Sequence, residues 1–280
     1  MRCFISLFLS FTALNASGNC LGDKNAKDPP YSFYVVPQLA VADSYAAWTP
    51  ILEEAGKKLS LCFVLKVPAS ISAFESDVRS VKPDFAFMNP YHLFINKRSQ
   101  GYVPLIADSQ NPLFGIVVIR KDSPIEKIED LNGKKMAFPS PNALAASLLI
   151  RAQLAKSNIK VIPEYVNSHS NVYRTVINGD VIAGGGVNNT FSREPVNLQQ
   201  ELKILFETAK YMPHPVAAST RVPVNVRKEM IQFFIELGKN PSMSGQLNAI
   251  QIPRPAEVNL KDYDYVKKLG LEKFAESSGG

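Results

Sequence analysis

Short runs of β-branched and aromatic residues alternate with longer amphipathic stretches from residue 31 onward. Short apolar runs bounded by turn residues are typical of buried strands, and the stretches between them are typical of helices that cover a sheet. The pattern predicts strands over 31–36, 61–67, 84–88, 102–107, 114–120, 134–138 and 160–166. It predicts helices over 43–59, 72–80, 90–98, 125–131, 142–156, 170–178 and 224–239. Such alternation indicates an α/β fold with mostly parallel sheets.

The first residues differ from this pattern. Arg2 is followed by an apolar segment from Cys3 to Leu14 in which only Ser and Thr interrupt the hydrophobic side chains. A positive start and a short apolar core are typical of a signal peptide, and the segment is shorter than the roughly 20 residues that span a bilayer. We expect 1–20 to be a signal peptide, 21–30 to be a linker, and the protein to be periplasmic or otherwise extracytoplasmic.

Length and charge limit the remaining possibilities. A mature chain of about 250 residues lies near the size at which one core divides into two, which favours two lobes. The full chain of 280 residues has 31 Lys and Arg against 25 Asp and Glu, which gives +6, spread along the chain. This charge is too mild to indicate a nucleic-acid partner, so we expect none, and we expect a monomer.

Two cysteines remain after removal of the signal peptide, Cys20 and Cys62. Cys20 lies where a lipoprotein would carry its lipid, although the usual preceding Leu and small residue are missing. A disulfide between the two is the other possibility in an oxidising compartment. Because Cys62 lies within an apolar run, we expect it to be a buried thiol.

Polar residues follow four predicted strands at the points where helices begin. Ser72 and Glu75 have the spacing of a capping box at the first of these junctions. Because the carboxyl ends of parallel strands share one edge, the four junctions converge where open α/β folds bind ligands. Helix starts present free N–H groups and a positive dipole end, which favours a small polar or anionic ligand. The junction residues expected to contact it are Ser70, Ser72, Asn89, Tyr91, Ser140, Asn142 and His169.

The sequence carries no motif for catalysis, a metal or a cofactor, and we expect none of these. The three histidines, His92, His169 and His214, lack metal-ligand spacing, and we expect His214 to fix a loop between two prolines. The run 184–186 of three glycines fits neither a phosphate loop nor a dinucleotide fingerprint. It is either a tight turn or a close backbone approach to a ligand or to the other lobe, with Asn188 as a polar contact.

Several segments resemble one family in the same order along the chain. They are Trp48-Thr49-Pro50, DFAFMNPYH (84–92), GIVVIRKDSPI (115–125), DLNGKKMAFPSPNA (130–143), SHSNVYRTVINGD (168–180) and AGGGVNNTF (183–191). They resemble the substrate-binding proteins of phosphate, phosphite and phosphonate ABC transporters over about 31–270. The resemblance implies a type II periplasmic-binding-protein fold whose two α/β lobes close over a ligand.

The same resemblance implies how the chain is divided. It places the first part of lobe one at 31–112, lobe two at 113–215, and the return to lobe one with C-terminal helices at 216–280. The chain would cross between lobes near 110–116 and again near 210–220, and the two crossings would act as the hinge.

The sequence departs from the family at the phosphonate site. The resemblance implies a Ser-Thr-Ser-Gly run at the start of the lobe-two helix, where this chain has Ala143-Leu144-Ala145-Ala146. Each missing hydroxyl bond to a charged group is worth about 1.5–3 kcal/mol, whereas the backbone N–H groups remain. Ser70 and Met88 replace the family's covering tyrosines. His169 matches its ligand-binding histidine, but the acidic partner of a ligand amine falls near Ile182, so no aminoalkylphosphonate is expected.

We therefore expect an exported, non-catalytic protein that captures a phosphate-like or phosphonate-like anion, or another small polar metabolite, for an ABC transporter permease. One alternative is a sensor that passes its ligand signal to a membrane histidine kinase. A second is an enzyme on the same fold, which needs Asp or Glu beside His169. A third is a surface lipoprotein or adhesin with a degenerate cleft, anchored through Cys20.

Overall fold

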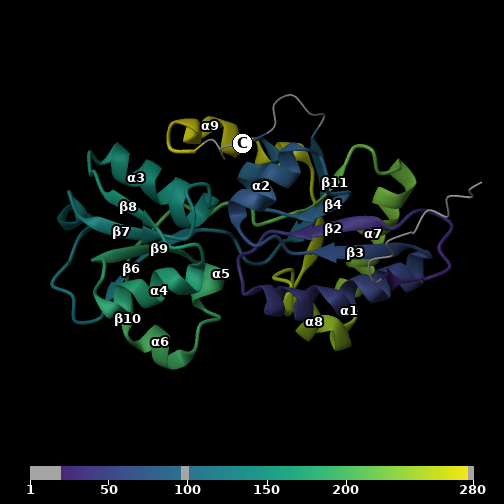
Figure 1. Cartoon of the computed structure of the whole chain (residues 1–280), viewed down its shortest axis with the longest axis horizontal. Helices are drawn as coiled ribbons and strands as arrows, with labels where there is room; N and C mark the ends of the chain where they lie inside the picture. The colour runs from purple at the N-terminus through teal and green to yellow at the C-terminus, as the bar shows by residue number, and fades with distance from the viewer. Residues whose placement is uncertain (1–19, 96–100, 277–280) are drawn as a thin grey trace, which may run out of the picture.

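The described residues of the computed structural model, 20–95 and 101–276, form two lobes that lie side by side (Figure 1). The predicted signal peptide lies outside these residues except for Cys20. One sheet has the strand order β1-β3-β2-β4-β11-β5-β12, and the other has the order β10-β6-β9-β7-β8. This is the expected α/β architecture of two sheets flanked by helices.

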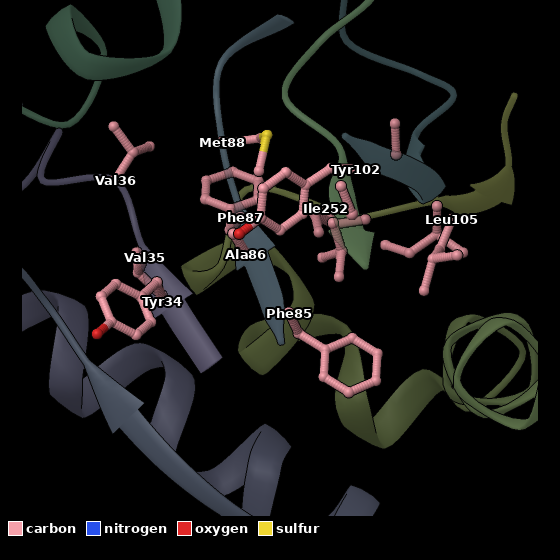
Figure 2. Close-up of a cluster of buried hydrophobic side chains, with 14 of the residues drawn as sticks. Tyr34, Val35, Val36, Phe85, Ala86, Phe87, Met88, Tyr102, Leu105 and Ile252 are labelled. Atoms are coloured by element: carbon pink, nitrogen blue, oxygen red, sulfur yellow. The ribbon is translucent and has the colours of Figure 1, made fainter. Parts of the chain in front are cut away.

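The sheet of lobe one combines strands from both ends of the chain. Strand β2 pairs in parallel with β3 and β4, and β11 lies antiparallel between β4 and β5. Figure 2 shows part of the core around β4, where apolar side chains of β2, β4 and β5 gather with Ile252. The strands are β1 (Leu21–Gly22), β2 (Tyr31–Val35), β3 (Cys62–Lys66), β4 (Phe85–Phe87), β5 (Tyr102–Asp108), β11 (Val216–Ser219) and β12 (Pro255–Glu257).

Helices cover the faces of this sheet through apolar stripes. Helix α1 (Val41–Leu59) buries Trp48, whose ring lies 4.9 Å from that of Phe33. Helix α7 (Val224–Gly238) buries the predicted apolar face that includes Met230 and Phe234. The other helical segments are α2 (Ile71–Arg79), η1 (Pro90–Leu93), η4 (Pro241–Met243), α8 (Ser244–Ala249), η5 (Leu260–Tyr263), α9 (Tyr265–Lys268) and η6 (Leu271–Lys273).

Lobe two is continuous in sequence. Its central strand β9 pairs antiparallel with β6 and parallel with β7. The strands are β6 (Gly115–Arg120), β7 (Lys135–Phe138), β8 (Ile162–Tyr165), β9 (Ala183–Val187) and β10 (Leu202–Glu207). The helical segments are η2 (Ile128–Leu131), the π-helical η3 (Leu144–Leu149), α3 (Ile150–Lys156), α4 (His169–Asn178), α5 (Asn188–Phe191) and α6 (Val196–Gln200).

The three consecutive glycines form the middle of β9 and not a tight turn. A Cβ on Gly185 would lie 2.1 Å from the carbonyl oxygen of Ala146, and one on Gly186 would lie 2.5 Å from the Tyr173 hydroxyl. The missing side chains therefore let η3 and α4 pack directly on the sheet. The tight-turn interpretation is wrong, and the close backbone approach is to helices of the same lobe.

Two neighbouring segments connect the lobes. The N–H of Leu113 donates to the Tyr211 carbonyl at 2.9 Å, and the N–H of Tyr211 donates back to Leu113 at 2.8 Å. The Gly115 N–H donates to the Thr208 hydroxyl at 2.9 Å. These hydrogen bonds hold the two crossing segments side by side.

A disulfide fastens the start of the described chain to lobe one. Cys20 and Cys62 are bonded, with their Cα atoms 5.4 Å apart, so the expectation of a buried Cys62 thiol is wrong. The sequence could not show this because the pairing depends on β1, which lies antiparallel to β3. The segment 21–30, expected as a linker, thus begins with a strand. No helix in the described ranges has the length and hydropathy that a membrane span needs.

Candidate functional site

Each of the four strand–helix junctions contributes to one small cavity between the lobes. Ile71, Asn89, Ala143 and His169 come from the first to the fourth junction in turn. The expected convergence is therefore present, but in two pairs: parallel strands bring together the junctions within each sheet, and the facing of the two lobes brings the pairs together. The cavity has a volume of about 10 Å³, room for about one water molecule. The other residues of its wall are Val36, Gln38, Leu144, Ala145, Ala146, Val187 and His214.

Side chains cap three of the helices that start at this cavity. The Ser70 hydroxyl accepts the Ala73 N–H at 3.1 Å at the start of α2. Asn89 accepts the His92 N–H at 3.1 Å at the start of η1, and Ser168 accepts the Asn171 N–H at the start of α4. These caps hold the helix starts in place towards the cavity.

The predicted capping box is wrong. Helix α2 begins at Ile71, so Ser70 is its cap and Ser72 lies exposed within the first turn. Glu75 does not reach back to the helix start but is buried, with its Oε1 3.2 Å from Nε2 of His92. Ser72 and Glu75 have the spacing of a capping box. However, Ser70, which lies two residues before Ser72 and has an extended backbone conformation, is the N-cap residue of the helix.

The lobe-two wall is mostly apolar. Ala143 stands at the start of η3 without a side-chain cap, and Leu144, Ala145 and Ala146 are buried behind it. Together with Val187 they join the core cluster of lobe one. The closed cleft is therefore held together partly by hydrophobic contact between the lobes.

The two histidines of the wall are neutral at pH 7. Burial lowers the pKa of His169 to about 4. Burial lowers the pKa of His214 to about 3, and the proximity of His92 and His169 adds to this shift. No Lys, Arg, Asp or Glu is among the residues of 20–95 and 101–276 that line the cavity. A ligand there would meet neutral hydrogen-bonding groups and helix starts instead of formal charges.

Gln38 and His214 also line the cavity, although neither was expected in the site from the sequence. Gln38 follows β2 as the other junction residues follow their strands, and this position was a usable signal. His214 comes from the return crossing, and its ring lies 5.5 Å from that of Phe87. Only the folded chain reveals that this crossing lies beside the cavity.

Asn142 connects the lobes and is not a helix cap. Its Nδ2 donates to the Glu75 carboxylate and to the Glu276 carbonyl, at 2.9 Å in each case. The Glu276 N–H donates back to Asn142 Oδ1 at 3.0 Å. This group of bonds, the Asn142 bridge, ties lobe two to α2 and to the C-terminal segment, which lies above the boundary between the lobes in Figure 1.

Asn188 lies away from the cavity, at a larger hollow of about 330 Å³ beside the crossing segments. Its Oδ1 accepts the Phe114 N–H at 3.3 Å, and its Nδ2 donates to the Pro112 carbonyl at 3.2 Å. Asn188 therefore holds one crossing segment. The hollow is lined by Asn111, Pro112, Leu113, Asn188, Asn189, Ser192, Arg193, Pro213, Asn248, Gln251 and Pro253.

A second connection between the lobes crosses this hollow. The Arg193 guanidinium donates to the carbonyls of Asn248 and Ala249 at the end of α8. Asn189 Nδ2 donates to Gln251 Oε1 at 2.6 Å. A guanidinium beside the last carbonyls of a helix is favourable, so these bonds also stabilise the closed arrangement.

The remaining predicted residues lie near the cavity but not in its wall. Tyr91 is half-buried in η1, and burial raises the pKa of its hydroxyl. Ser140 is buried, and its carbonyl accepts the Ala143 N–H at 3.4 Å. The wall thus includes Asn89 and His169 from the predicted set, and Ser70 caps the helix beside it.

His169 has a hydroxyl neighbour and not a carboxylate. Its Nδ1 lies 3.4 Å from the Thr190 hydroxyl, which in turn lies 3.0 Å from that of Tyr173. Among the hydrogen bonds and ion pairs of residues 20–95 and 101–276, none joins His169 to Asp or Glu. The described residues also contain no cluster of His, Cys, Asp and Glu suited to a metal ion.

A family model, described as the ABC transporter phosphonate periplasmic substrate-binding protein, matches residues 33–263. The phosphonates-binding periplasmic protein of Escherichia coli is 22% identical over 269 residues, covering 89% of this chain and 79% of that protein.

Solved structures share the fold. A binding protein component of an ABC phosphonate transporter from Pseudomonas aeruginosa has a TM-score of 0.75 at 16% identity, covering 86% of each chain. A Prochlorococcus marinus protein in complex with methylphosphonate has a TM-score of 0.76 at 14% identity, covering 86% of this chain and 96% of that one. The aliphatic sulphonate binding protein of Escherichia coli has a TM-score of 0.64 at 12% identity, covering 88% of this chain and 87% of that one.

Proposed function

The chain belongs to the phosphonate periplasmic substrate-binding proteins of ABC transporters, and we propose that it captures a small oxyacid in the cavity between its lobes for delivery to a permease. The convergence of the four strand–helix junctions on that cavity is the observation that carries the proposal. Free N–H groups at helix starts bind oxyanions without any cationic side chain.

The neutral wall suits this ligand class. Oxygens of the acid would accept hydrogen bonds from the helix starts and from Asn89 and His169. A short alkyl group would lie against Val36, Ile71 and the alanines of η3. Two of the structural relatives are a methylphosphonate complex and a sulphonate-binding protein, which supports an oxyacid of similar size.

Binding requires the lobes to open. The closed cavity of about 10 Å³ holds about one water molecule, so an oxyacid enters only after the crossing segments bend. The ligand then replaces part of the apolar contact between η3 and lobe one. Opening also breaks the Asn142 bridge and the Arg193 contacts, which the ligand's own bonds must offset.

Phosphonates with an amino group are poor candidates. The position that corresponds to the family's acidic partner, near Ile182, lies at a separate hollow of about 440 Å³ in lobe two. Within the described part of the chain, that hollow shares no wall residue with the cavity. The missing hydroxyls at Ala143–Ala146 also weaken the binding of a phosphonate headgroup relative to the family pattern.

The other expectations fit this proposal. Export through a signal peptide that is cleaved before Cys20, and not after it as the expected bounds 1–20 imply, would place a monomer in the periplasm and keep Cys20 for the disulfide with Cys62. A sulfur held in that bond cannot carry a lipid anchor. The enzyme alternative loses support because His169 contacts Thr190 and not a carboxylate. A sensor kinase would read the same closure of the lobes as a permease does.

A thermal-shift screen of the mature protein tests the ligand class. The panel is phosphate, phosphite, methylphosphonate, sulfate, carboxylates and amino acids. A ligand at 100 times its Kd stabilises the folded protein by about 2.7 kcal/mol. We expect oxyacids of phosphorus to raise the melting temperature. The proposal would be contradicted if amino acids alone raised it, or if no solute in the panel raised it.

A further inference from the structure

Two buried polar atoms in the cavity wall have no hydrogen-bond partner within the described part of the chain. They are Oε1 of Gln38 and Nδ1 of His214. Gln38 is 8% exposed and His214 is 5% exposed. Both line the cavity where the four junctions meet. Buried polar groups almost always have a hydrogen-bond partner in folded proteins, so two such atoms without one in the same wall indicate a partner that binds there.

The type of each atom limits the partner. An amide Oε1 only accepts hydrogen bonds, and a neutral imidazole has one donor and one acceptor nitrogen. His214 is neutral because burial and the neighbouring histidines disfavour its charged form. Lobe one therefore offers an acceptor to the ligand, whereas the helix starts offer donors. A partner that satisfies both must donate as well as accept.

We propose that Gln38, supported by His214, selects an oxyacid that retains a proton, such as a phosphonate monoanion, over a fully ionised one such as a sulfonate. A P–OH group donates to Gln38 Oε1 while the remaining oxygens accept from the helix starts. A sulfonate of the same shape has no proton to donate, and its oxygen would face the amide oxygen. This inference rests on the proposed function, which assigns oxyacids to the cavity.

Methylphosphonate and methanesulfonate provide the test because they differ in little more than this proton. Calorimetric titration of the mature protein should show tighter binding of methylphosphonate by about tenfold or more, since a sulfonate leaves the buried acceptor unpaired. The preference should shrink as the pH rises and methylphosphonate becomes a dianion. This pH series needs no variant.

The variant Gln38→Met keeps the length of the side chain but removes the acceptor. It should lose most of the preference, through weaker methylphosphonate binding and unchanged or stronger methanesulfonate binding. Gln200→Met is the matched control, because Gln200 is exposed on α6 and is not among the residues that line the cavity. The control should keep the preference of the original chain.

Two results would contradict this inference without contradicting the proposed function. One is equal affinity of the original chain for both acids. The other is an equal loss of both acids in Gln38→Met, which would mean that the amide donates through its nitrogen. Binding of neither acid nor of any other oxyacid would instead contradict the proposed function, and this inference with it.

Discussion

The two walls of the cavity differ in chemistry although they meet in one closed site. The lobe-one wall presents Gln38, Asn89 and His214, and among the described residues Gln38 Oε1 and His214 Nδ1 find no hydrogen-bond partner. The lobe-two wall presents the alanine and leucine run that replaces the family's hydroxyls, with His169 as its polar side chain. Under the proposed function, side-chain recognition would come mainly from lobe one, and lobe two would contribute His169, backbone N–H groups and apolar contact.

Acid should weaken the fold through one histidine from each wall. The pKa of His169 falls from 6.5 to about 4, and that of His214 falls from 6.5 to about 3. In the unfolded chain these two histidines take up protons below pH 6.5, whereas in the folded chain they do not. The stability that depends on their neutral form is therefore complete above that pH and is lost as pH falls towards 4. One pKa unit corresponds to about 1.4 kcal/mol, so the loss should reach several kcal/mol.

Urea unfolding across this pH range measures the effect. His169→Gln and His214→Gln should each flatten the pH dependence, and each variant reports on one wall. An unchanged slope in both variants would contradict the neutral, buried state of these side chains.

A carboxylate in the lobe-two wall should abolish oxyacid binding. Ala145→Glu places a negative charge among helix starts that attract anions, in a cavity with room for about one water molecule. We expect affinity to fall by at least about a hundredfold, because a buried like charge faces the ligand. Calorimetry on this variant and on Ala155→Glu, at an exposed position on α3, checks the prediction. Full affinity in Ala145→Glu would place the ligand elsewhere.

The Asn142 bridge should contribute more to stability than the Arg193 contacts. Asn142 is 3% exposed, and Asn142→Leu leaves the carboxylate of Glu75 without this donor, at a cost of about 2 kcal/mol. Arg193→Ala acts at an exposed side chain and should cost about 1 kcal/mol or less. Urea unfolding of both variants measures the two losses of stability. A larger loss in Arg193→Ala than in Asn142→Leu would show that the contacts at the hollow beside the crossings contribute more to the closed arrangement.

Restoring a hydroxyl should strengthen the lobe-two wall. Ala145→Ser returns one hydroxyl of the family's run, and one bond to a charged oxygen predicts about a tenfold gain for methylphosphonate. Ala155→Ser is the control on the exposed side of α3. No gain in Ala145→Ser would mean that the ligand does not approach this position.

Much of the fold could be predicted from the sequence because burial of parallel strands leaves long apolar runs. All seven predicted strands are present, within two residues at each end. Strand β9 was missed because three glycines provide no side-chain pattern, and β11 (VAAS) was missed because its small residues resemble a helix or a loop. The predicted helix at 125–131 is only the short turn η2.

The site could be predicted in part. Parallel strands bring together the two junctions of each lobe, but Asn89 and His169 follow strands of different sheets, so their meeting depends on how the two lobes face each other. The roles of Asn142 and Asn188 could not be predicted, because their partners Glu276 and Phe114 lie far away in the chain. His214 reaches the wall only through the return crossing, so its place depends on tertiary structure alone.

A crystal structure of the mature protein grown with methylphosphonate would show where the ligand binds. We expect the acid between the lobes, with its oxygens within hydrogen-bond distance of the helix starts at Ile71, Ala143 and His169 and one oxygen beside Gln38. Methylphosphonate bound instead in the hollow beside Arg193, with the wall of Gln38 and Ala145 still sealed, would contradict this expectation.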